Sequence, residues 1–194
     1  MIFQFQKQFP ELNSYWERYL PHQKRLEIPA RTKLLQEGAF SQQAIYIDRG
    51  CLRVFFNNKG EEKTVQFFFE GEGLSSLDSF VNHLPSPFTI ESMEPSIVYL
   101  LPKRYVLELL EEMTLGPGFL MLFLKMMASR LNHYSGEFVS FIRDTPEERY
   151  QRLIKERPHI VQRIKQHYIA SYLGISSVHL SRIKSKLAKG QAHF

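Results

Sequence analysis

Between residues 24 and 102, apolar and aromatic residues gather in short runs that turn residues separate. The runs are rich in β-branched and aromatic side chains, which favour strands, and they lie at 44–47, 52–56, 64–69 and 96–100. Turn signals that contain glycine or asparagine lie near their ends, at 37–38, 49–50, 57–60 and 70–73. Short strands at this spacing predict an antiparallel sandwich or barrel. We expect flanking helices over 10–22 and 102–113.

A longer, helical pattern begins after the Gly116-Pro117-Gly118 break. Its apolar seam has spacings that alternate between four and three residues, at Leu120, Leu124, Met127, Leu131, Tyr134, Phe138 and Phe141. This heptad pattern predicts a helix over 118–142, which would be about 37 Å long. We interpret the seam as a homodimer contact between two copies of the helix. The alternative is that the seam packs on the β-region of the same chain.

A helix-start signal follows this long helix. Thr145 is a candidate N-cap, Pro146 occupies the first helical position, and Glu148 completes a capping box. The signal therefore predicts a domain boundary near 143–144. The new helix should end at Arg157, because Pro158 disfavours its continuation.

Residues 166–185 have the pattern of a helix-turn-helix. Ala170, at the fifth position, is small enough for two helices to cross closely, and Gly174, at the ninth, suits a left-handed turn. Ser176 is a good N-cap for the second helix. The five positions that must be buried are all apolar: Ile169, Leu173, Ile175, Leu180 and Ile183. The alternative is an ordinary helical hairpin.

The residues left exposed on the second helix are the candidate DNA contacts. In a helix-turn-helix, the N-terminal residues of this helix lie near base edges in the major groove. Arg182 is our candidate for bidentate recognition of guanine, Val178 for contact with a thymine methyl group, and Ser177 and His179 for secondary base contacts. His179 is equally well explained as a solvated surface histidine. The candidate backbone contacts are His167, Ser176, Ser181, Lys184 and Lys186.

Charge supports a polyanionic partner for the C-terminal region. The 194 residues have a net charge of +5, but residues 143–194 contain 11 Lys and Arg against 4 Asp and Glu. That segment therefore carries +7 and residues 1–142 carry −2, and no acidic residue follows Glu156. Such asymmetry is typical of nucleic-acid binding. A solvated basic surface is the alternative.

Other classes of protein fit the composition poorly. The length allows one large domain or two smaller ones. Cys51 is the one cysteine, so an internal disulfide and a cysteine-rich metal site are excluded. The sequence has no signal-peptide pattern and no apolar run long enough for a transmembrane helix, so we expect a soluble, cytoplasmic protein without a membrane partner. No metal-ligand spacing or catalytic constellation stands out, and we expect no enzyme activity.

The order of these segments resembles the cyclic-AMP receptor protein / fumarate-nitrate regulator (Crp/Fnr) superfamily of bacterial transcription factors. Residues 34–38 (LLQEG) and 45–54 (IYIDRGCLRV) match its opening strands and their glycines, and 169–187 (IASYLGISSVHLSRIKSKL) match its helix-turn-helix. The resemblance implies an α+β fold with an antiparallel β-roll sensor over 1–115, a dimerisation helix over 116–143 and a DNA-binding domain over 144–194.

The resemblance also implies partners. These are a second copy of the chain, double-stranded DNA with a palindromic operator and, as a further candidate, RNA polymerase. The family contacts bases with an Arg–Glu pair and a later Arg. Here Ser177-Val178 replaces the pair and Arg182 matches the later Arg. The DNA sequence that this chain recognises should therefore differ from that of the cyclic-AMP receptor. The alternative is a small-molecule sensor or interaction protein with a degenerate DNA-binding domain.

The sensor region departs from the cyclic-nucleotide-binding pattern. In the family, a Gly-Glu pair binds the ribose and an Arg-Ser pair binds the cyclic phosphate. These pairs align with Ser75-Ser76 and Ser86-Pro87 of this chain. A Thr-Ser pair on the family's long helix aligns with Tyr134-Ser135. No Lys or Arg occurs from Val65 to Pro102, and an enclosed phosphate without a cation is costly to desolvate.

We therefore expect that cyclic AMP is not bound in the usual way, and we assign no cofactor. The degenerate effector pocket would be lined by Ser75, Ser76, Asp78, Ser86, Thr89, Tyr134 and Ser135. It is vestigial or accepts a less anionic ligand. Alternatively, these residues belong only to loops and core.

Overall fold

The computed structural model describes residues 17–114 and 119–191. The chain divides into two compact units, one of residues 1–56 and 66–124 and one of residues 57–65 and 125–194. The predicted break at 116–118 lies outside the described residues, as does most of the helix predicted over 10–22. Its described end is helical from residue 17 and finishes in a 3₁₀ turn, Leu20–His22.

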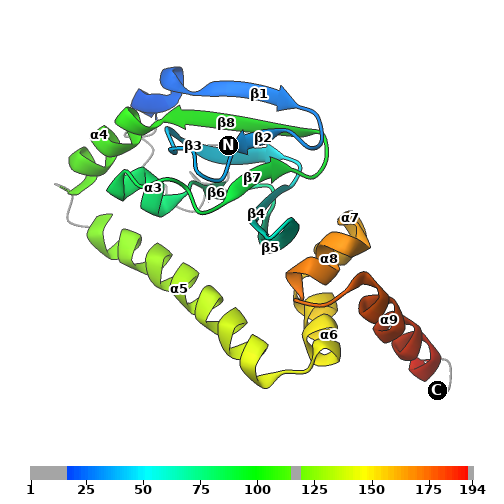
Figure 1. Ribbon diagram of the computed structural model, residues 1–194. Coiled ribbons are helices and arrows are strands. Elements are labelled where there is room, and N and C mark those ends of the chain that lie inside the picture. The colour runs from blue at the N-terminus through cyan, green and yellow to red at the C-terminus, as the bar shows by residue number, and fades with distance from the viewer. Residues whose placement is uncertain (1–16, 115–118, 192–194) are drawn as a thin grey trace. The chain divides into compact units, whose positions relative to one another are not determined.

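The predicted antiparallel β-region is confirmed as two four-stranded sheets (Figure 1). The strands are β1 (Lys24–Ile28), β2 (Lys33–Leu35), β3 (Gln43–Arg49), β4 (Leu52–Asn58), β5 (Glu61–Phe68), β6 (Gly73–Leu74), β7 (Thr89–Ser92) and β8 (Ser96–Pro102). One sheet has the order β1-β8-β3-β6 and the other β2-β7-β4-β5. Sequence-distant strands thus lie side by side, as in a jelly roll.

Alternation along the strands places one face of each sheet in a shared core. Ile45 and Ile47 of β3 face this core together with Val98, which pairs with Ile47 across β3 and β8. Leu52 of β4 and Ile90 of β7 enter it from the other sheet. Each fully buried aliphatic side chain of this kind contributes about 1.5–3 kcal/mol to folding.

Two of the helices that the structure describes, α3 (Leu77–Asn82) and α4 (Lys103–Thr114), lie in the first unit with the sheets. Helix α4 confirms the helix predicted over 102–113. Helix α3 was not predicted, and it ends at His83 in a left-handed conformation with a φ of 58°.

The predicted long helix is confirmed as α5 (Phe119–Arg143). Its 25 residues correspond to a length of about 37 Å. None of the helices in the described part of the chain is both long and apolar enough to cross a membrane.

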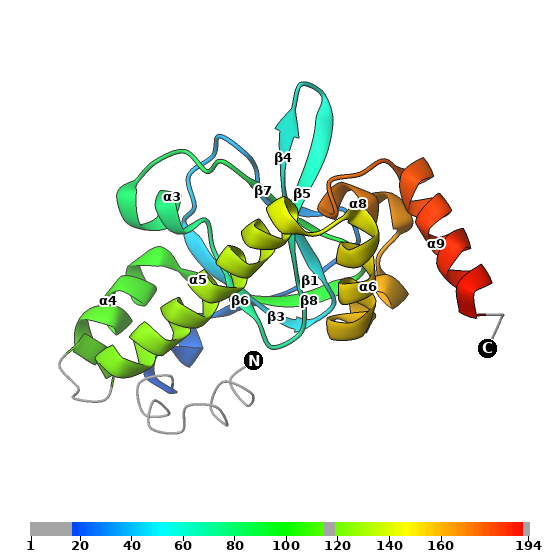
Figure 2. The same cartoon turned by 90° about the horizontal axis from the view of Figure 1, so that it is seen from below.

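In the described part of the second unit, four helices follow α5: α6 (Pro146–Glu156), α7 (Pro158–Arg163), α8 (Gln166–Tyr172) and α9 (Ser177–Gln191). Figure 2 labels α6, α8 and α9. The predicted capping box of α6 is present. The Glu148 backbone N–H donates to Thr145 Oγ1 at 3.3 Å, and the Thr145 N–H donates to Glu148 Oε2 at 2.8 Å. Pro158 ends α6 as expected, and it also begins the short helix α7, which was not predicted.

Candidate nucleic-acid interface

Helices α8 and α9 are joined by a short turn that depends on Gly174. This residue has a φ of +70°, a conformation that side chains with a Cβ rarely adopt. A Cβ there would also lie 3.1 Å from Cε1 of Phe141. The Ile175 N–H donates to the Ala170 carbonyl at 3.0 Å, which closes the turn across the small residue. The left-handed glycine predicted from the sequence is therefore present.

The apolar positions predicted for this segment hold α8 against α9. Ile169, Leu173, Leu180 and Ile183 are buried, and Ile175 is half-buried. Ala170 is buried as well, as a close crossing of the two helices requires. The sequence pattern thus predicted the core of this segment correctly.

The opposite face of α9 is exposed, polar and basic. Its exposed side chains are Ser177, Val178, His179, Ser181, Arg182, Ser185 and Lys186. A shallow surface groove on this helix is lined by Ser181, Arg182, Ser185, Lys186 and Lys189. Most of the candidate base and backbone contacts therefore share one surface.

The remaining candidate backbone contacts have different surroundings. Ser176 caps α9, because its hydroxyl accepts a hydrogen bond from the His179 N–H at 3.2 Å. Lys184 is half-buried. His167 is exposed near the start of α8, and its ring centroid lies 3.8 Å from that of Tyr168.

The sequence did not reveal that Lys186 has an acidic neighbour. Its Nζ lies 2.7 Å from Oε2 of Glu147, in the first turn of α6. The two residues are 39 positions apart, so no local spacing rule predicts the pair. The predicted phosphate contact is thus engaged by a carboxylate in the free chain.

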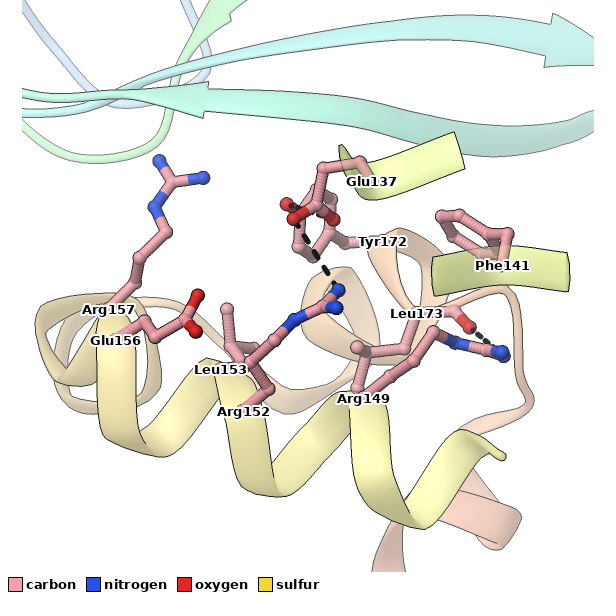
Figure 3. Close-up of a pocket in the computed structure, with 9 residues that line it drawn as sticks. All are labelled: Glu137, Phe141, Arg149, Arg152, Leu153, Glu156, Arg157, Tyr172 and Leu173. Carbon is pink, nitrogen blue, oxygen red and sulfur yellow. Dashed lines mark hydrogen bonds and ion pairs between the residues drawn. The ribbon is translucent and has the colours of Figure 1, made fainter. Parts of the chain in front are cut away.

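A second group of residues, which was not predicted from the sequence, joins the end of α5 to α6 and α8. We call it the arginine cluster, and its members are Glu137, Ser140, Asp144, Arg149, Arg152 and Tyr172. Of this group, Figure 3 draws Glu137, Arg149, Arg152 and Tyr172. Arg152 Nη1 donates to Asp144 Oδ2 at 3.0 Å, and Arg152 Nη2 donates to Ser140 Oγ and lies 3.6 Å from Glu137 Oε1. The Tyr172 hydroxyl donates to Glu137 Oε2 at 3.1 Å.

Arg149 occupies the other side of the arginine cluster. Its Nη1 donates to the Asp144 carbonyl at 2.7 Å and its Nη2 to the Leu173 carbonyl at 3.1 Å. Its guanidinium carbon lies 4.7 Å from the centre of the Phe141 ring. Phe141, which we had placed on the dimer seam, therefore also packs within its own chain.

The arginine cluster changes the acidity of its members. Hydrogen bonds from Arg143 and Ser140, together with the positive charges of Arg143 and Arg152, lower the pKa of Asp144 to about 2. Burial raises the pKa of Tyr172, and the negative charge of Glu137 raises it further. Asp144 is thus ionised, and Tyr172 keeps its hydroxyl proton, at neutral pH.

A sequence signal for the arginine cluster does exist. Glu137, Ser140 and Asp144 are spaced three and four residues apart, and so are neighbours along one side at the end of α5. Arg149 and Arg152 are likewise three apart on α6. This polar stripe beside an apolar seam could have indicated a packed, polar helix junction.

The residues predicted to line an effector pocket are engaged in local structure. In the first unit, the Ser86 hydroxyl donates to the Phe88 carbonyl at 2.8 Å, and Thr89 Oγ1 accepts from the Glu37 N–H at 3.0 Å. Asp78 accepts from the Asn82 amide at 2.6 Å. Ser76 is the buried N-cap residue of α3, and Ser75 is half-buried. On α5, in the second unit, Tyr134 and Ser135 are exposed.

A buried cation lies on β4, outside the segment from Val65 to Pro102 that contains no Lys or Arg. Arg53 Nη2 is 2.9 Å from Glu91 Oε2 on β7, and only 1% of the Arg53 side chain is exposed. The guanidinium carbon also lies 3.9 Å from the centre of the Phe55 ring. Leu52 and Val54 face the core, so Arg53 and its cross-strand partner Glu91 lie on the other face of the sheet. The charge of Arg53 is therefore balanced by an acid of the same sheet.

Within the described residues, no group of three or more His, Cys, Asp and Glu side chains is close enough to hold a metal ion. Cys51 is buried at the start of β4, with its Sγ 3.7 Å from the Leu52 carbonyl oxygen.

Comparison with known proteins gives a match for the β-region and helix α4. A family model of the cyclic nucleotide-binding domain matches residues 25–113. No curated protein matches the chain in sequence.

Several solved structures match most of the chain. The c-di-GMP responsive global regulator CLP of Xanthomonas campestris is 16% identical, with coverage of 92% of this chain and 93% of its own, and a TM-score of 0.72. FixK2 of Bradyrhizobium japonicum is 15% identical, and the match covers 87% of this chain and 86% of FixK2 with a TM-score of 0.73. The catabolite activator protein of Thermus thermophilus is 19% identical, and the match covers 92% of this chain and 84% of that protein's chain with a TM-score of 0.51.

At these identities the solved structures establish a shared fold. The matches extend well beyond residues 25–113, because the two solved structures with the higher TM-scores cover 87% or more of this chain. Residues 25–113 thus match the cyclic nucleotide-binding domain, and the chain shares the fold of these solved structures.

Proposed function

We propose that this protein is a homodimeric transcription regulator, and not an enzyme, whose helix α9 binds the major groove of double-stranded DNA. The observation that carries the proposal is the division of α9 into two faces. Leu180 and Ile183 are buried against the preceding helices, whereas the opposite face is exposed and includes Arg182 and Lys186. A helix with an apolar inner face and a polar, basic outer face suits groove binding.

The α8–turn–α9 segment is then a helix-turn-helix. Within this role, Arg182 contacts guanine, and Ser177, Val178 and His179 lie nearer the start of α9, beside the base edges. His167, Ser176, Ser181, Lys184 and Lys186 contact the DNA backbone. RNA polymerase is the further partner, and the cytoplasm is the expected location.

The seam of α5 supports dimerisation. Within this single chain, Leu124, Leu131, Tyr134, Phe138 and Phe141 are exposed, and the exposed fractions of Leu131 and Phe138 reach 66% and 67%. The side chain of Leu120 lies outside those described, and Met127 is half-buried. Large apolar side chains at heptad spacing favour association with a second copy of the helix.

Dimerisation gives the protein its control mechanism. Two half-sites one helical turn apart require two recognition helices about 34 Å apart. The sensor domain would set the geometry of the α5 pair, and a ligand would act only through different affinities for the competent and incompetent geometries. Operators for such a dimer are palindromic, because the two subunits are related by a two-fold axis.

The sensor does not, in this proposal, hold cyclic AMP through an arginine–phosphate pair. Hydrogen bonds to Ser86 and Thr89 already fix their loops, and Arg53 is paired with Glu91. Calorimetry of the full chain with cyclic AMP, and with the c-di-GMP to which CLP is described as responsive, tests this. We expect no heat of binding for cyclic AMP, and tight binding of one cyclic AMP per subunit would contradict the proposal.

Selection of bound sequences from a pool of random double-stranded DNA tests the main function. We expect an enriched palindrome whose affinity falls steeply as salt rises, because bound phosphates release counterions. Candidate nucleotides added to parallel selections identify the effector. Enrichment of no sequence, with only weak binding that salt abolishes, would instead favour a sensor or interaction protein with a degenerate DNA-binding segment.

A further inference from the structure

The end of α5 and the helices that follow it are connected by more than the chain itself. Arg152, on α6, interacts with three acceptors at the end of α5: the Glu137 carboxylate and the Ser140 hydroxyl on its last turns, and the Asp144 carboxylate just after it. The three acceptors follow one another along one side of α5. A single planar guanidinium therefore holds α6 to the end of α5 at three points, of which Figure 3 draws the one at Glu137.

Arg149 ties the same helix α5 to the turn before α9. One of its nitrogens donates to the Asp144 carbonyl, just after α5, and another donates to the Leu173 carbonyl, at the end of α8. Both carbonyls lie at helix ends, where they lack intrahelical partners. Its guanidinium also faces the Phe141 ring of α5. Arg149 thus joins the ends of two helices that are about thirty residues apart in the chain.

A third connection runs directly from α8 to α5. The hydroxyl of Tyr172, a buried residue, donates to Glu137, the same carboxylate that faces Arg152. Since α8 packs on α9 through buried apolar residues, a hold on α8 is also a hold on α9.

These groups are shielded from water more than surface ion pairs usually are. The exposed fraction of the side chain is 26% for Arg152, 29% for Glu137 and 15% for Asp144. Isolated, exposed ion pairs contribute little, but networks of partly buried charges with good geometry are screened less by salt and resist reorientation. The arrangement therefore fits a fixed angle between α5 and the α8–α9 pair better than it fits a loose linker.

We propose that Arg149 and Arg152 are positioning residues for DNA binding, which fix the direction of α9 relative to α5 and thereby set the spacing of the two operator half-sites. The inference rests on the proposed function, because it requires a dimer through α5 and DNA contact through α9. Arg149 and Arg152 themselves need not touch DNA. Neighbouring half-site spacings differ by about 3.4 Å along the DNA axis and about 34° in rotation, so a fixed angle distinguishes them.

The experiment compares variants of the whole chain for binding to a series of DNA duplexes. Each duplex contains the two selected half-sites, and the spacer between them ranges from two base pairs shorter to two base pairs longer than the spacer found by selection. Arg152→Ala and Asp144→Asn both break the arginine cluster, but they change the net charge in opposite directions. A purely electrostatic effect on DNA affinity would therefore have opposite signs in the two variants, whereas a loosened joint would change the spacing preference of both in the same way. Lys155→Ala, on the same helix but outside the cluster, is the matched control for loss of a positive charge.

We expect the parent to prefer one spacing over its neighbours by about tenfold, since a rotation of this size separates α9 from the groove. In Arg152→Ala and Asp144→Asn that preference should fall to about threefold or less, while affinity for a single half-site changes by less than about threefold. Lys155→Ala should keep the parent's spacing preference. Circular dichroism and thermal unfolding establish that each variant is folded.

Some outcomes would overturn the inference. A parent-like spacing preference in both cluster variants would show that these residues do not position α9. The same holds if Arg152→Ala unfolds and the folded variant Asp144→Asn keeps the parent's preference. Failure of the parent itself to bind any selected duplex is a different result, because it refutes the proposed function and the inference with it.

Discussion

The ring of Phe141, near the end of α5, lies against Gly174, in the turn between α8 and α9. A Cβ placed on Gly174 would be 3.1 Å from Cε1 of Phe141, closer than most side-chain contacts. Gly174 also has a φ of +70°. The turn therefore needs glycine for two independent reasons, its backbone conformation and the aromatic ring packed over it.

Substitution of Gly174 should consequently be costly. We expect Gly174→Ala to lower the free energy of unfolding by about 1–3 kcal/mol, because an L-residue is strained at this φ and the added methyl group displaces Phe141. Urea unfolding followed by circular dichroism measures the change. Gly136→Ala is the matched control, since Gly136 lies within α5 with no atom within 4 Å of its built Cβ. That control should stabilise the helix by roughly 0.5–1 kcal/mol, and equal stability of the Gly174→Ala variant and the parent would contradict the interpretation of the turn.

The parts of the fold that the sequence predicted share one property, which is a strong local signal. The runs that became β3, β4, β5 and β8 are rich in β-branched and aromatic residues, and the seam of α5 keeps its spacing over the whole helix. The capping box at Thr145 and the glycine at 174 each impose a local geometry. Such signals act within a few residues of each other, so they can be recognised without knowledge of tertiary contacts.

The parts that were missed depend on tertiary contacts. Strand β1 contains three charged residues and β2 has only three residues, and both pair with strands more than fifty positions away. In the candidate site, the Glu147–Lys186 pair and the Arg149–Leu173 contact likewise join distant positions. Composition and periodicity do not determine which distant residues meet, and this explains why the exposed face of α9 was predicted but the arginine cluster was not.

Arg182 should determine one base of each half-site. We expect Arg182→Ala to weaken binding to the selected operator by about 1–3 kcal/mol and to relax the preference at a single position. Binding titrations on the operator and on its single-base variants measure both effects. Lys184→Ala, which removes a backbone contact, should weaken binding to all these duplexes alike and lower the salt slope by about one. If Arg182→Ala also weakens all sequences equally, Arg182 contacts phosphate and not guanine.

Glu147 should restrain DNA binding through Lys186. The Lys186 side chain is 71% exposed and the Glu147 side chain 29% exposed. Their ion pair is therefore weak, and Lys186 can exchange it for a phosphate contact. Loss of the carboxylate in Glu147→Gln should raise DNA affinity about twofold to fivefold, because Lys186 no longer has to leave an acidic partner. Titrations at several salt concentrations measure this. Glu108→Gln, an exposed change of the same charge on α4, serves as control. An equal rise in that control would assign the effect to net charge alone.

Leu131 should be required for the dimer but not for folding of the single chain. Its side chain is 66% exposed within one chain, so a charge there costs little until a second copy covers it. We expect Leu131→Glu to weaken dimerisation by more than about tenfold, since burial of a leucine contributes about 1.5–3 kcal/mol. Sedimentation equilibrium measures the dissociation constant. Asn132→Glu, at the adjacent exposed position off the seam, should leave it unchanged, and a stable Leu131→Glu dimer would place the interface elsewhere.

Asp144 should give the folded state part of its sensitivity to acid. Hydrogen bonds from Arg143 and Ser140 and the nearby charge of Arg152 lower its pKa from an ordinary value of 3.8 to about 2. Because the pKa is lower in the folded than in the unfolded state, this stabilisation is complete above about pH 5 and is lost as the pH falls through about 4 toward 2. Asp144→Asn lacks it at every pH.

Unfolding by urea at pH 7, 5, 4 and 3 measures this contribution directly. The parent should be more stable than Asp144→Asn at pH 7 and 5, and the difference should shrink at pH 4 and 3, where the unfolded parent takes up a proton that the folded parent does not. Ser140→Ala, which removes one donor but keeps the carboxylate and both arginines, should show a smaller loss of pH dependence than Asp144→Asn. Parallel stability curves for the parent and Asp144→Asn across this range would mean that Asp144 titrates alike in the folded and unfolded chain, and that its contacts with Arg143, Ser140 and Arg152 do not persist in solution.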